Sequence, residues 1–384
     1  MTSPLPPERV SPERAGLEPQ KERRSDPWAI AMGIIGGVLL GTGLTFAILG
    51  YVGIFEEPTP PTPPTIPPAP TLTVPSTSPP LTFGDDVSMA SVAAQVAPST
   101  VAVQVGSFFA EGSGSGVVYG TDGYIITNHH VMEVGGTISV VFVDGAVFPA
   151  QVVGSDPVTD IGVLLVERAD LTPVSVGSSD SLSIGEPTVA VGNPLGLVGG
   201  PTVTSGIVSA LNRSLEIPGG EILYGLVQTD APIAPGSSGG ALVDAAGQLV
   251  GITTAIAVSN VGPADLGFAV PTEIAIGVAN DLIGTGDVRH ALLGISGTTA
   301  YAEEGEARYP VGILVEDVDS SSAYEAAGGR VNDVIVELDG EPVNTLDSLL
   351  ARLRRLRAGQ TIPVRILRSD ANTNLDVTLG LLNP

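Results

Sequence analysis

The chain has 384 residues, of which 43% are hydrophobic and only 4% aromatic, and its formal net charge is −25. This length suffices for two or three domains with cores of Val, Ile, Leu and Ala. The acidity argues against binding to a nucleic-acid backbone, and the lack of cysteine excludes disulfides, cysteine–metal sites and thiol catalysis.

The N-terminal part of the chain has the pattern of a membrane anchor. Residues 1–27 are rich in Pro, Glu and Arg and predict a disordered cytoplasmic tail. Residues 28–55 carry no charge, and a helix of that length spans roughly 40 Å, more than a bilayer core. Basic residues precede this stretch and none follows it until Arg168, so the positive-inside rule predicts an extracytoplasmic location for the rest of the chain. A cleaved signal peptide is the alternative, but the apolar run is long for one.

A spacer and a β-rich unit follow the predicted transmembrane helix. Residues 56–86 are dominated by Pro and Thr, which predicts an extended, semi-rigid linker. Residues 87–287 contain about a dozen short β-branched runs separated by Gly, Pro and Asp-Gly pairs, which is typical of β-barrels or sandwiches. Helices are predicted at its two ends, over Ser88–Val96 and Thr272–Leu282.

A second, smaller unit is predicted over residues 288–384. It contains one amphipathic helix, Leu346–Leu356, in which leucines occupy one face and arginines the other. Thr345 is the expected N-cap and Gly359 the expected stop. Four strand-like runs surround the helix: Gly312–Val318, Asp333–Leu338, Ile362–Leu367 and Asp376–Leu379.

One glycine-rich stretch suggests a serine nucleophile. Gln228–Val243 reads QTDAPIAPGSSGGALV, with two serines between glycines and apolar segments on either side. Glycines allow positive φ and close approach of a bound chain, and backbone N–H groups beside an exposed serine could stabilise an oxyanion. Read alone, the five residues Gly236–Gly240 are also typical of a simple turn.

Only three histidines could supply a general base for that serine. His129 and His130 end an apolar strand within the β-rich unit, while His290 lies outside it. Adjacent residues of an extended chain point in opposite directions, so a metal site built from this pair is not expected. Asp160 precedes another apolar strand and is the natural acid to orient the base, although an Asp at a strand start is often only a turn residue.

The order His130, Asp160, Ser238 resembles the HtrA family of extracytoplasmic serine proteases, most closely its membrane-anchored, single-PDZ DegS-like type. Six segments carry the resemblance: GYIITNHHV (123–131), VTDIGVLLV (158–166), VAVGNPLGL (189–197), VTSGIVSAL (203–211), QTDAPIAPGSSGGALV (228–243) and LGFAVP (266–271). The resemblance implies a mainly β fold, a chymotrypsin-like pair of six-stranded barrels over 87–287. It also implies that His130, Asp160 and Ser238 form the catalytic triad.

The resemblance further assigns the surroundings of the serine. The oxyanion hole involves Gly236, Ser237 and Ser238, with the N–H groups of Gly236 and Ser238 as donors and Ser237, where the family usually has Asn, between them. The substrate pocket is expected to suit small or medium apolar side chains. Its implied residues are Asn193, Leu195, Thr253, Leu266 and Gly267.

Residues 291–380 resemble a PDZ domain, a small α+β fold. Leu292, Leu293, Gly294 and Ile295 match its carboxylate-binding loop, which implies that C-terminal peptides add there as a strand. The run Gly328–Asp333 departs from the usual family pattern, so the local turn is expected to differ. The stretch Phe108–Ser113 is short where some members carry a long regulatory loop, which makes a loop-caged hexamer less expected.

These observations predict a membrane-anchored extracytoplasmic serine endopeptidase of envelope protein quality control or stress response. It needs no metal or other cofactor, its substrates are polypeptides, and the family implies a possible homotrimer. Two alternatives stay open. The chain could be a catalytically idle scaffold, or a protease that cleaves one membrane signalling protein.

Overall fold

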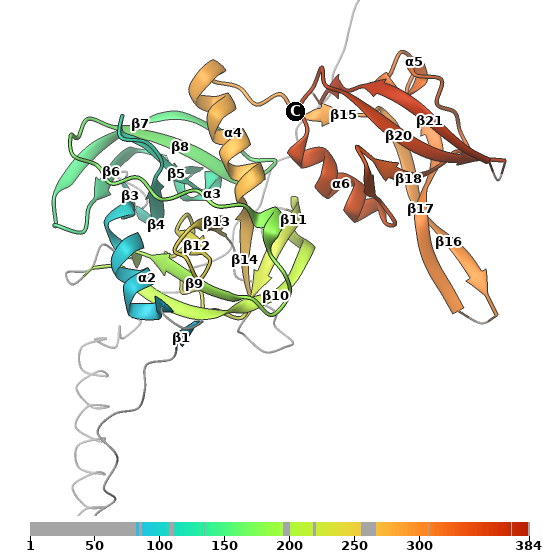
Figure 1. The fold of residues 1–384 in the computed structure, drawn as a ribbon. Helices are drawn as coiled ribbons and strands as arrows, with labels where there is room; N and C mark the ends of the chain where they lie inside the picture. The colour runs from blue at the N-terminus through green and yellow to red at the C-terminus, as the bar shows by residue number, and fades with distance from the viewer. Residues whose placement is uncertain are drawn as a thin grey trace, which may run out of the picture. The chain divides into compact units, whose positions relative to one another are not determined.

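The computed structural model describes most of the chain after residue 81 (Figure 1). The described residues are 82–83, 87–106, 111–133, 135–194, 200–217, 220–254, 266–305, 307–369 and 371–382. They belong to one compact unit that begins at Thr77. The predicted tail, the predicted membrane helix at 28–55 and nearly all of the predicted linker lie outside the described residues. Among those described, no helix has both the length and the apolar character of a membrane span.

The first barrel is built from six antiparallel strands in the closed order β3-β4-β5-β8-β7-β6 (Figure 1). Its strands are β3 (Thr100–Gly106), β4 (Glu111–Val118), β5 (Tyr124–Thr127), β6 (Thr137–Val141), β7 (Val147–Asp156) and β8 (Ile161–Val166). A short helix, α3 (His129–Glu133), follows β5. Val, Ile and Leu side chains from these strands fill the barrel, as the β-branched runs predict.

The second barrel repeats this plan in the order β10-β11-β14-β13-β12-β9. Its strands are β9 (Pro187–Gly192), β10 (Thr202–Glu216), β11 (Ile222–Thr229), β12 (Ala241–Val243), β13 (Leu249–Thr253) and β14 (Gly267–Pro271). A shared hydrophobic cluster includes residues of both barrels, such as Ile161 of β8 and Val191 of β9. The predicted fold class, mainly β with two six-stranded barrels, is therefore confirmed.

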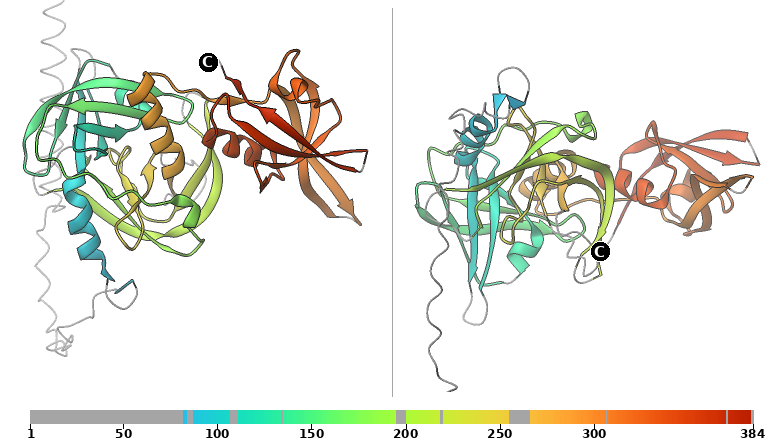
Figure 2. Two further views of the ribbon diagram at one scale, coloured as in Figure 1. Left: turned by 45° about the horizontal axis from the view of Figure 1, so that its top comes forward. Right: turned by 90° about the horizontal axis from the view of Figure 1, so that it is seen from below.

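Helices cover the outside of the barrels. Helix α2 (Met89–Val96) begins at Ser88, whose hydroxyl accepts a hydrogen bond from the Ser91 N–H, and it lies beside β9 (Figure 2). Helix α4 (Thr272–Thr285) contacts β13 of the second barrel and also β7 and β8 of the first. It ends at Gly286, a left-handed C-cap. Three-residue 3₁₀ turns span Ala97–Ser99 and Ser179–Ser181.

The C-terminal domain is a six-stranded antiparallel sheet with two helices; five strands follow the order β16-β17-β18-β20-β21, and the short strand β19 pairs with β18. Its elements are β15 (Ala291–Leu292), β16 (Ile295–Glu304), β17 (Ala307–Val318), α5 (Ala323–Ala326), β18 (Val334–Leu338), β19 (Glu341–Pro342), α6 (Leu346–Arg355), β20 (Thr361–Arg368), β21 (Ala371–Thr378) and β22 (Gly380–Leu381). Strand β15 pairs with β22, and two short strands near the start of the described chain, β1 (Thr82–Phe83) and β2 (Val87–Ser88), pair with each other. Helix α6 begins as predicted at Thr345, which forms a reciprocal capping box with Ser348.

Candidate active site

The end of β5 places His130 beside Asp160. Helix α3 buries Val131 and Met132, and this leaves the His130 side chain 38% exposed. Its Nδ1 lies 2.9 Å from both carboxylate oxygens of Asp160, and its backbone N–H donates to Oδ1 at 3.0 Å. His129 faces elsewhere, since its Nδ1 lies 2.9 Å from Ser155 Oγ. The geometry therefore pairs Asp160 with His130 and not with His129.

Asp160 is buried and is fixed by several neighbours. It is 1% exposed, and its backbone is in the left-handed region with φ of 57°. Thr254 Oγ1 donates to its Oδ2 at 2.6 Å, and Asn128 Nδ2 donates to its backbone carbonyl at 2.8 Å. A carboxylate held in this way can keep the imidazole in one tautomer, with Nε2 free to accept a proton. Neither Thr254 nor Asn128 was predicted from the sequence, although Asn128 lies within the histidine segment 123–131.

Ser238 lies in a loop that is hydrogen-bonded to the first barrel. Its carbonyl oxygen accepts a 2.7 Å hydrogen bond from the Ser115 N–H on β4. The neighbouring Gly114 has no room for a side chain, because a Cβ there would lie 2.6 Å from Val131 and 3.2 Å from the Ser238 carbonyl oxygen. The nucleophile loop and the helix of His130 therefore meet across Gly114.

The serine and the base do not form a hydrogen bond in this state. Among the hydrogen bonds of the described residues, there is no bond between Ser238 Oγ and the His130 ring. In proteases without substrate such contacts are often long and tighten in the Michaelis complex. The His130 ring is held at Nδ1 by Asp160, and its side chain is partly exposed. A general base requires this arrangement.

Two backbone N–H groups beside Ser238 are candidates for an oxyanion hole. The Ser237 N–H donates to the Ala234 carbonyl at 2.9 Å, whereas within the described chain the N–H groups of Gly236 and Ser238 have no acceptor. The Gly236 carbonyl is turned toward Ser115, whose hydroxyl donates to it at 2.8 Å. The two unbonded N–H groups therefore flank the bonded one of Ser237, which is the arrangement that an oxyanion hole requires.

The expected pocket residues occupy different positions around this loop. Thr253 is buried and donates through Oγ1 to the Ser237 carbonyl at 2.7 Å. Asn193 is also buried, and its backbone N–H donates to Ser115 Oγ at 2.8 Å. Thr253 therefore bonds the loop directly, and Asn193 bonds it through Ser115. Leu266 is 38% exposed, and Leu195 lies outside the described residues.

An isoleucine that the sequence analysis did not single out lies at this pocket. Ile233 is five residues before Ser238 in the same loop, and a Cβ built on Gly267 would lie 2.5 Å from its Cδ1. Ile233 also lines a hollow of about 10 Å³ together with Gly192, Ser237 and Thr253. Ile233 makes one side of this hollow apolar, and the preference for a small or medium apolar substrate side chain stays a prediction.

The four residues expected to bind a peptide C-terminus lie at the start of the C-terminal domain. Gly294 has a φ of 75°, and its carbonyl accepts from the Asp319 N–H at 3.0 Å. Leu293 is buried, Leu292 ends β15 and Ile295 begins β16. Strand β16 is an edge of the six-stranded sheet, which is the position to which a peptide can add as a further strand.

The segment Gly328–Asp333, which departs from the usual PDZ pattern, forms a turn. An ion pair between Asp333 and Arg368 stabilises this turn. Asp333 is 1% exposed and receives hydrogen bonds from the Arg330 N–H at 2.8 Å and from the Tyr324 hydroxyl at 3.0 Å. Arg368 also binds it, with Nε at 2.7 Å. Hydrogen bonds from these groups outweigh burial and hold the pKa of Asp333 below its ordinary value.

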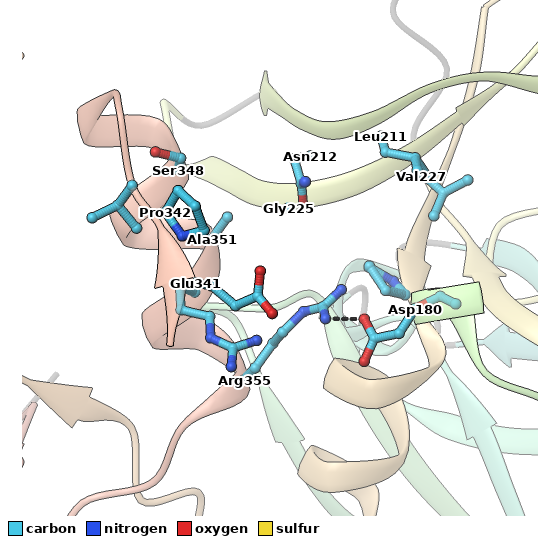
Figure 3. Close-up of a pocket in the computed structure, with 14 residues that line it drawn as sticks. Asp180, Leu211, Asn212, Gly225, Val227, Glu341, Pro342, Ser348, Ala351 and Arg355 are labelled. Atoms are coloured by element: carbon cyan, nitrogen blue, oxygen red, sulfur yellow. Dashed lines mark hydrogen bonds and ion pairs between the residues drawn. The ribbon is translucent and has the colours of Figure 1, made fainter. Parts of the chain in front are cut away.

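A cavity of about 340 Å³ lies between α6 and the second barrel, away from the triad (Figure 3). Arg355 and Asp180 form an ion pair across it, and Asn212 and Gly225 line its barrel side. Since none of the triad residues lines it, we assign it no part in the reaction. Among the described residues, no cluster of three or more His, Asp or Glu side chains is arranged to hold a metal ion.

Comparison with known proteins identifies the family. Residues 114–252 match the model of the trypsin-like peptidase domain, and residues 291–379 match that of the PDZ domain. The chain is 34% identical to the serine protease PepD of Mycobacterium tuberculosis over 373 residues, which are 91% of this chain and 77% of PepD. The chain belongs to the HtrA-type serine proteases.

Other HtrA relatives agree with this assignment. The chain is 40% identical over 275 residues to the periplasmic pH-dependent serine endoprotease DegQ of Escherichia coli K12, covering 70% of this chain and 59% of DegQ. Thus it spans less than two thirds of that relative. The solved structure of the HtrA-type protease AlgW with tripeptide matches with a TM-score of 0.63 and 36% identity, covering 77% of this chain and 97% of that one.

Proposed function

We propose that this HtrA-type protease is a membrane-anchored, extracytoplasmic serine endopeptidase that cleaves misfolded or exposed segments of envelope proteins. The observation that carries the activity is the alignment of Asp160 with His130 beside a serine loop that has two unbonded N–H groups. The uncharged stretch 28–55, preceded by basic residues, supports the anchor. The relatives named as periplasmic endoproteases support the compartment and the substrate class.

The reaction follows from the geometry. Ser238 Oγ attacks the scissile carbonyl carbon while His130 Nε2 takes its proton, and Asp160 stabilises the resulting imidazolium through Nδ1. The N–H groups of Gly236 and Ser238 bind the oxyanion of the tetrahedral intermediate. The imidazolium then protonates the leaving amine, and an acyl-enzyme remains. Water, activated by the same histidine, hydrolyses this ester and restores Ser238.

The C-terminal domain supports a recruiting or regulatory role. A peptide C-terminus would be held by the loop Leu292–Ile295 and extend along β16. A solved structure of the HtrA-type protease AlgW with a decapeptide supports peptide binding by this type of protease. Assembly as a homotrimer is part of the proposal and rests on the family alone.

A labelling experiment tests the activity. Purified chain should react with a fluorophosphonate probe and cleave unfolded casein, and Ser238→Ala should abolish both. Ser183→Ala is the control, because it changes an exposed serine outside the loop and should keep both reactions. If the wild-type chain neither reacts with the probe nor cleaves casein, the alternative of an idle scaffold is correct. Trapping of a single membrane client by Ser238→Ala in cells would instead favour site-specific signalling proteolysis.

A further inference from the structure

His290 forms a buried contact with the first barrel although it belongs to the segment that leads into the C-terminal domain. It lies between α4 and β15, and it forms a β-bridge with Arg357. Its Nε2 lies 2.8 Å from Asp156 Oδ1, and each of the two side chains is 6% exposed. The proposed reaction does not use this third histidine.

Asp156 stands at the start of the turn that carries the catalytic acid. It is the last residue of β7, and the chain turns over four residues before β8 begins. The last residue of this turn is Asp160. While Oδ1 of Asp156 faces His290, its Oδ2 accepts a hydrogen bond from the hydroxyl of Thr159, the neighbour of Asp160. One carboxylate therefore joins the domain junction to the triad turn.

The turn needs such support because Asp160 adopts an uncommon conformation. Its φ of 57° places a non-glycine residue in the left-handed region, which costs free energy and persists only where surrounding contacts enforce it. Thr254 and Asn128 hold the Asp160 end of the turn. The hydrogen bond from Thr159 to Asp156 joins this end to the start of the turn.

We propose that His290 is a positioning residue of the protease: through Asp156 it fixes the turn 156–160 and so presents Asp160 to His130. Docking of the C-terminal domain and alignment of the triad are then linked. When the domain leaves the barrel, His290 leaves with it, and the buried Asp156 loses its partner. The inference rests on the proposed protease activity.

The charges around the pair fit this role. Arg354 of α6 and Tyr224 of β11 face the same junction, and Arg357 pairs with Asp281 of α4. Burial lowers the pKa of Arg354, while the Asp156 carboxylate counteracts it. Burial also opposes ionisation of Asp156, but the hydrogen bond and charge of His290 bring its pKa below the ordinary value. The Asp156 carboxylate is therefore held ionised in a buried place where removing its partner is costly.

Kinetics of matched variants of the full chain test the inference. His290→Ala should lower kcat for a chromogenic peptide by about tenfold to a hundredfold with KM nearly unchanged, because the acid is displaced and not the substrate. His290→Gln, which keeps a donor near the Nε2 position, should restore kcat to within about threefold of wild type. The control is Asp180→Asn, which removes the ion pair with Arg355 at the same domain junction but does not touch the turn. It should stay within about twofold.

The outcomes separate the two claims. An inactive wild type would overturn the proposed function itself. An active wild type with unchanged kcat in His290→Ala, or with an equal loss in Asp180→Asn, would overturn the positioning role. If His290→Ala does not fold by circular dichroism, Asp156→Asn replaces it, since it keeps the shape and removes the charge. The same loss of kcat is expected for it, and an unchanged kcat would overturn the inference.

A spectroscopic measurement reports the triad directly. The chain has only three histidines, so selective ¹⁵N-histidine labelling in the Ser238→Ala background gives few ring signals. The Nδ1–H signal of His130, which depends on Asp160, should shift or broaden in His290→Ala and stay unchanged in Asp180→Asn. An unaltered His130 signal in His290→Ala would show that the contact serves stability alone.

Discussion

Thr254 Oγ1 donates a 2.6 Å hydrogen bond to Asp160 Oδ2, and this joins the catalytic acid of the first barrel to a strand end of the second. Both residues are buried, with exposures of 0% and 1%. Alignment of the proposed triad therefore depends on the packing of the two barrels against each other. Thr254 provides the hydrogen bond through which this packing acts on Asp160.

Thr254→Val should lower kcat because it removes this donor while keeping the shape of the side chain. A buried carboxylate that loses one hydrogen bond reorients toward its other partners, and we expect kcat to fall by about tenfold at unchanged KM. Thr254→Ser keeps the hydroxyl and should retain most of the activity. Steady-state kinetics with active-site titration measure the difference, and equal rates for Val and Thr would refute this role.

Ser115 of β4 is expected to fix the conformation of the oxyanion loop by hydrogen bonding. Its hydroxyl accepts from the Asn193 N–H and donates to the Gly236 carbonyl, each at 2.8 Å. Ser115→Ala would free the peptide after Gly236 to rotate, and kcat should fall by about tenfold or more, up to the roughly hundredfold to thousandfold loss that follows removal of an oxyanion donor. Labelling by the fluorophosphonate should slow in parallel.

Ser183→Ala is the control for Ser115→Ala. Ser183 is exposed and lies before β9, away from the loop, so this substitution removes a hydroxyl without altering the loop contacts. It should leave kcat within about twofold. If the two alanine variants behave alike, Ser115 has no special role in the loop.

The residues proposed to carry the chemistry could be selected from the sequence, whereas those that position them could not. His130, Asp160 and Ser238 lie in distinctive local segments, and capping residues such as Thr345 are equally local. Thr254, by contrast, is 94 residues from its partner. A lone threonine or histidine without a surrounding motif carries no signal, because its partner is chosen by the three-dimensional packing of the barrels.

Strand boundaries show the same division. The runs with buried β-branched residues were predicted well, but β16 was missed, and β17 begins at Ala307 and not at Gly312. The outer half of this hairpin has no apolar alternation, since Tyr301 and Tyr309 are about half exposed. Its strands are held by pairing with each other, which periodicity does not reveal.

Gly239 should tolerate no side chain. It has a φ of 87°, and a Cβ there would lie 2.2 Å from the Ser115 carbonyl oxygen. Gly239→Ala is therefore expected to displace Ser238 and abolish measurable proteolysis, with a lower melting temperature. Gly145→Ala is the matched control, because Gly145 has a similar φ of 81° with open space around it. This control should cost only about 1 kcal/mol of stability and keep the activity. A fully active Gly239→Ala variant would contradict the close packing of the loop.

Acid should weaken the C-terminal domain through Asp333. Its hydrogen-bonded ion pair with Arg368 depresses the pKa of this carboxyl in the folded state, so the unfolded chain binds the proton more readily. The stabilisation is then fully present above the ordinary aspartate value of about 4 and is lost as pH falls through the lower folded value. In wild type, the melting temperature of the domain should fall steeply as the pH drops below about 4. Asp333→Asn should melt lower at pH 7 and show a flatter acid limb, measured by circular dichroism. An acid limb as steep in Asp333→Asn as in wild type would assign the acid sensitivity to other carboxylates.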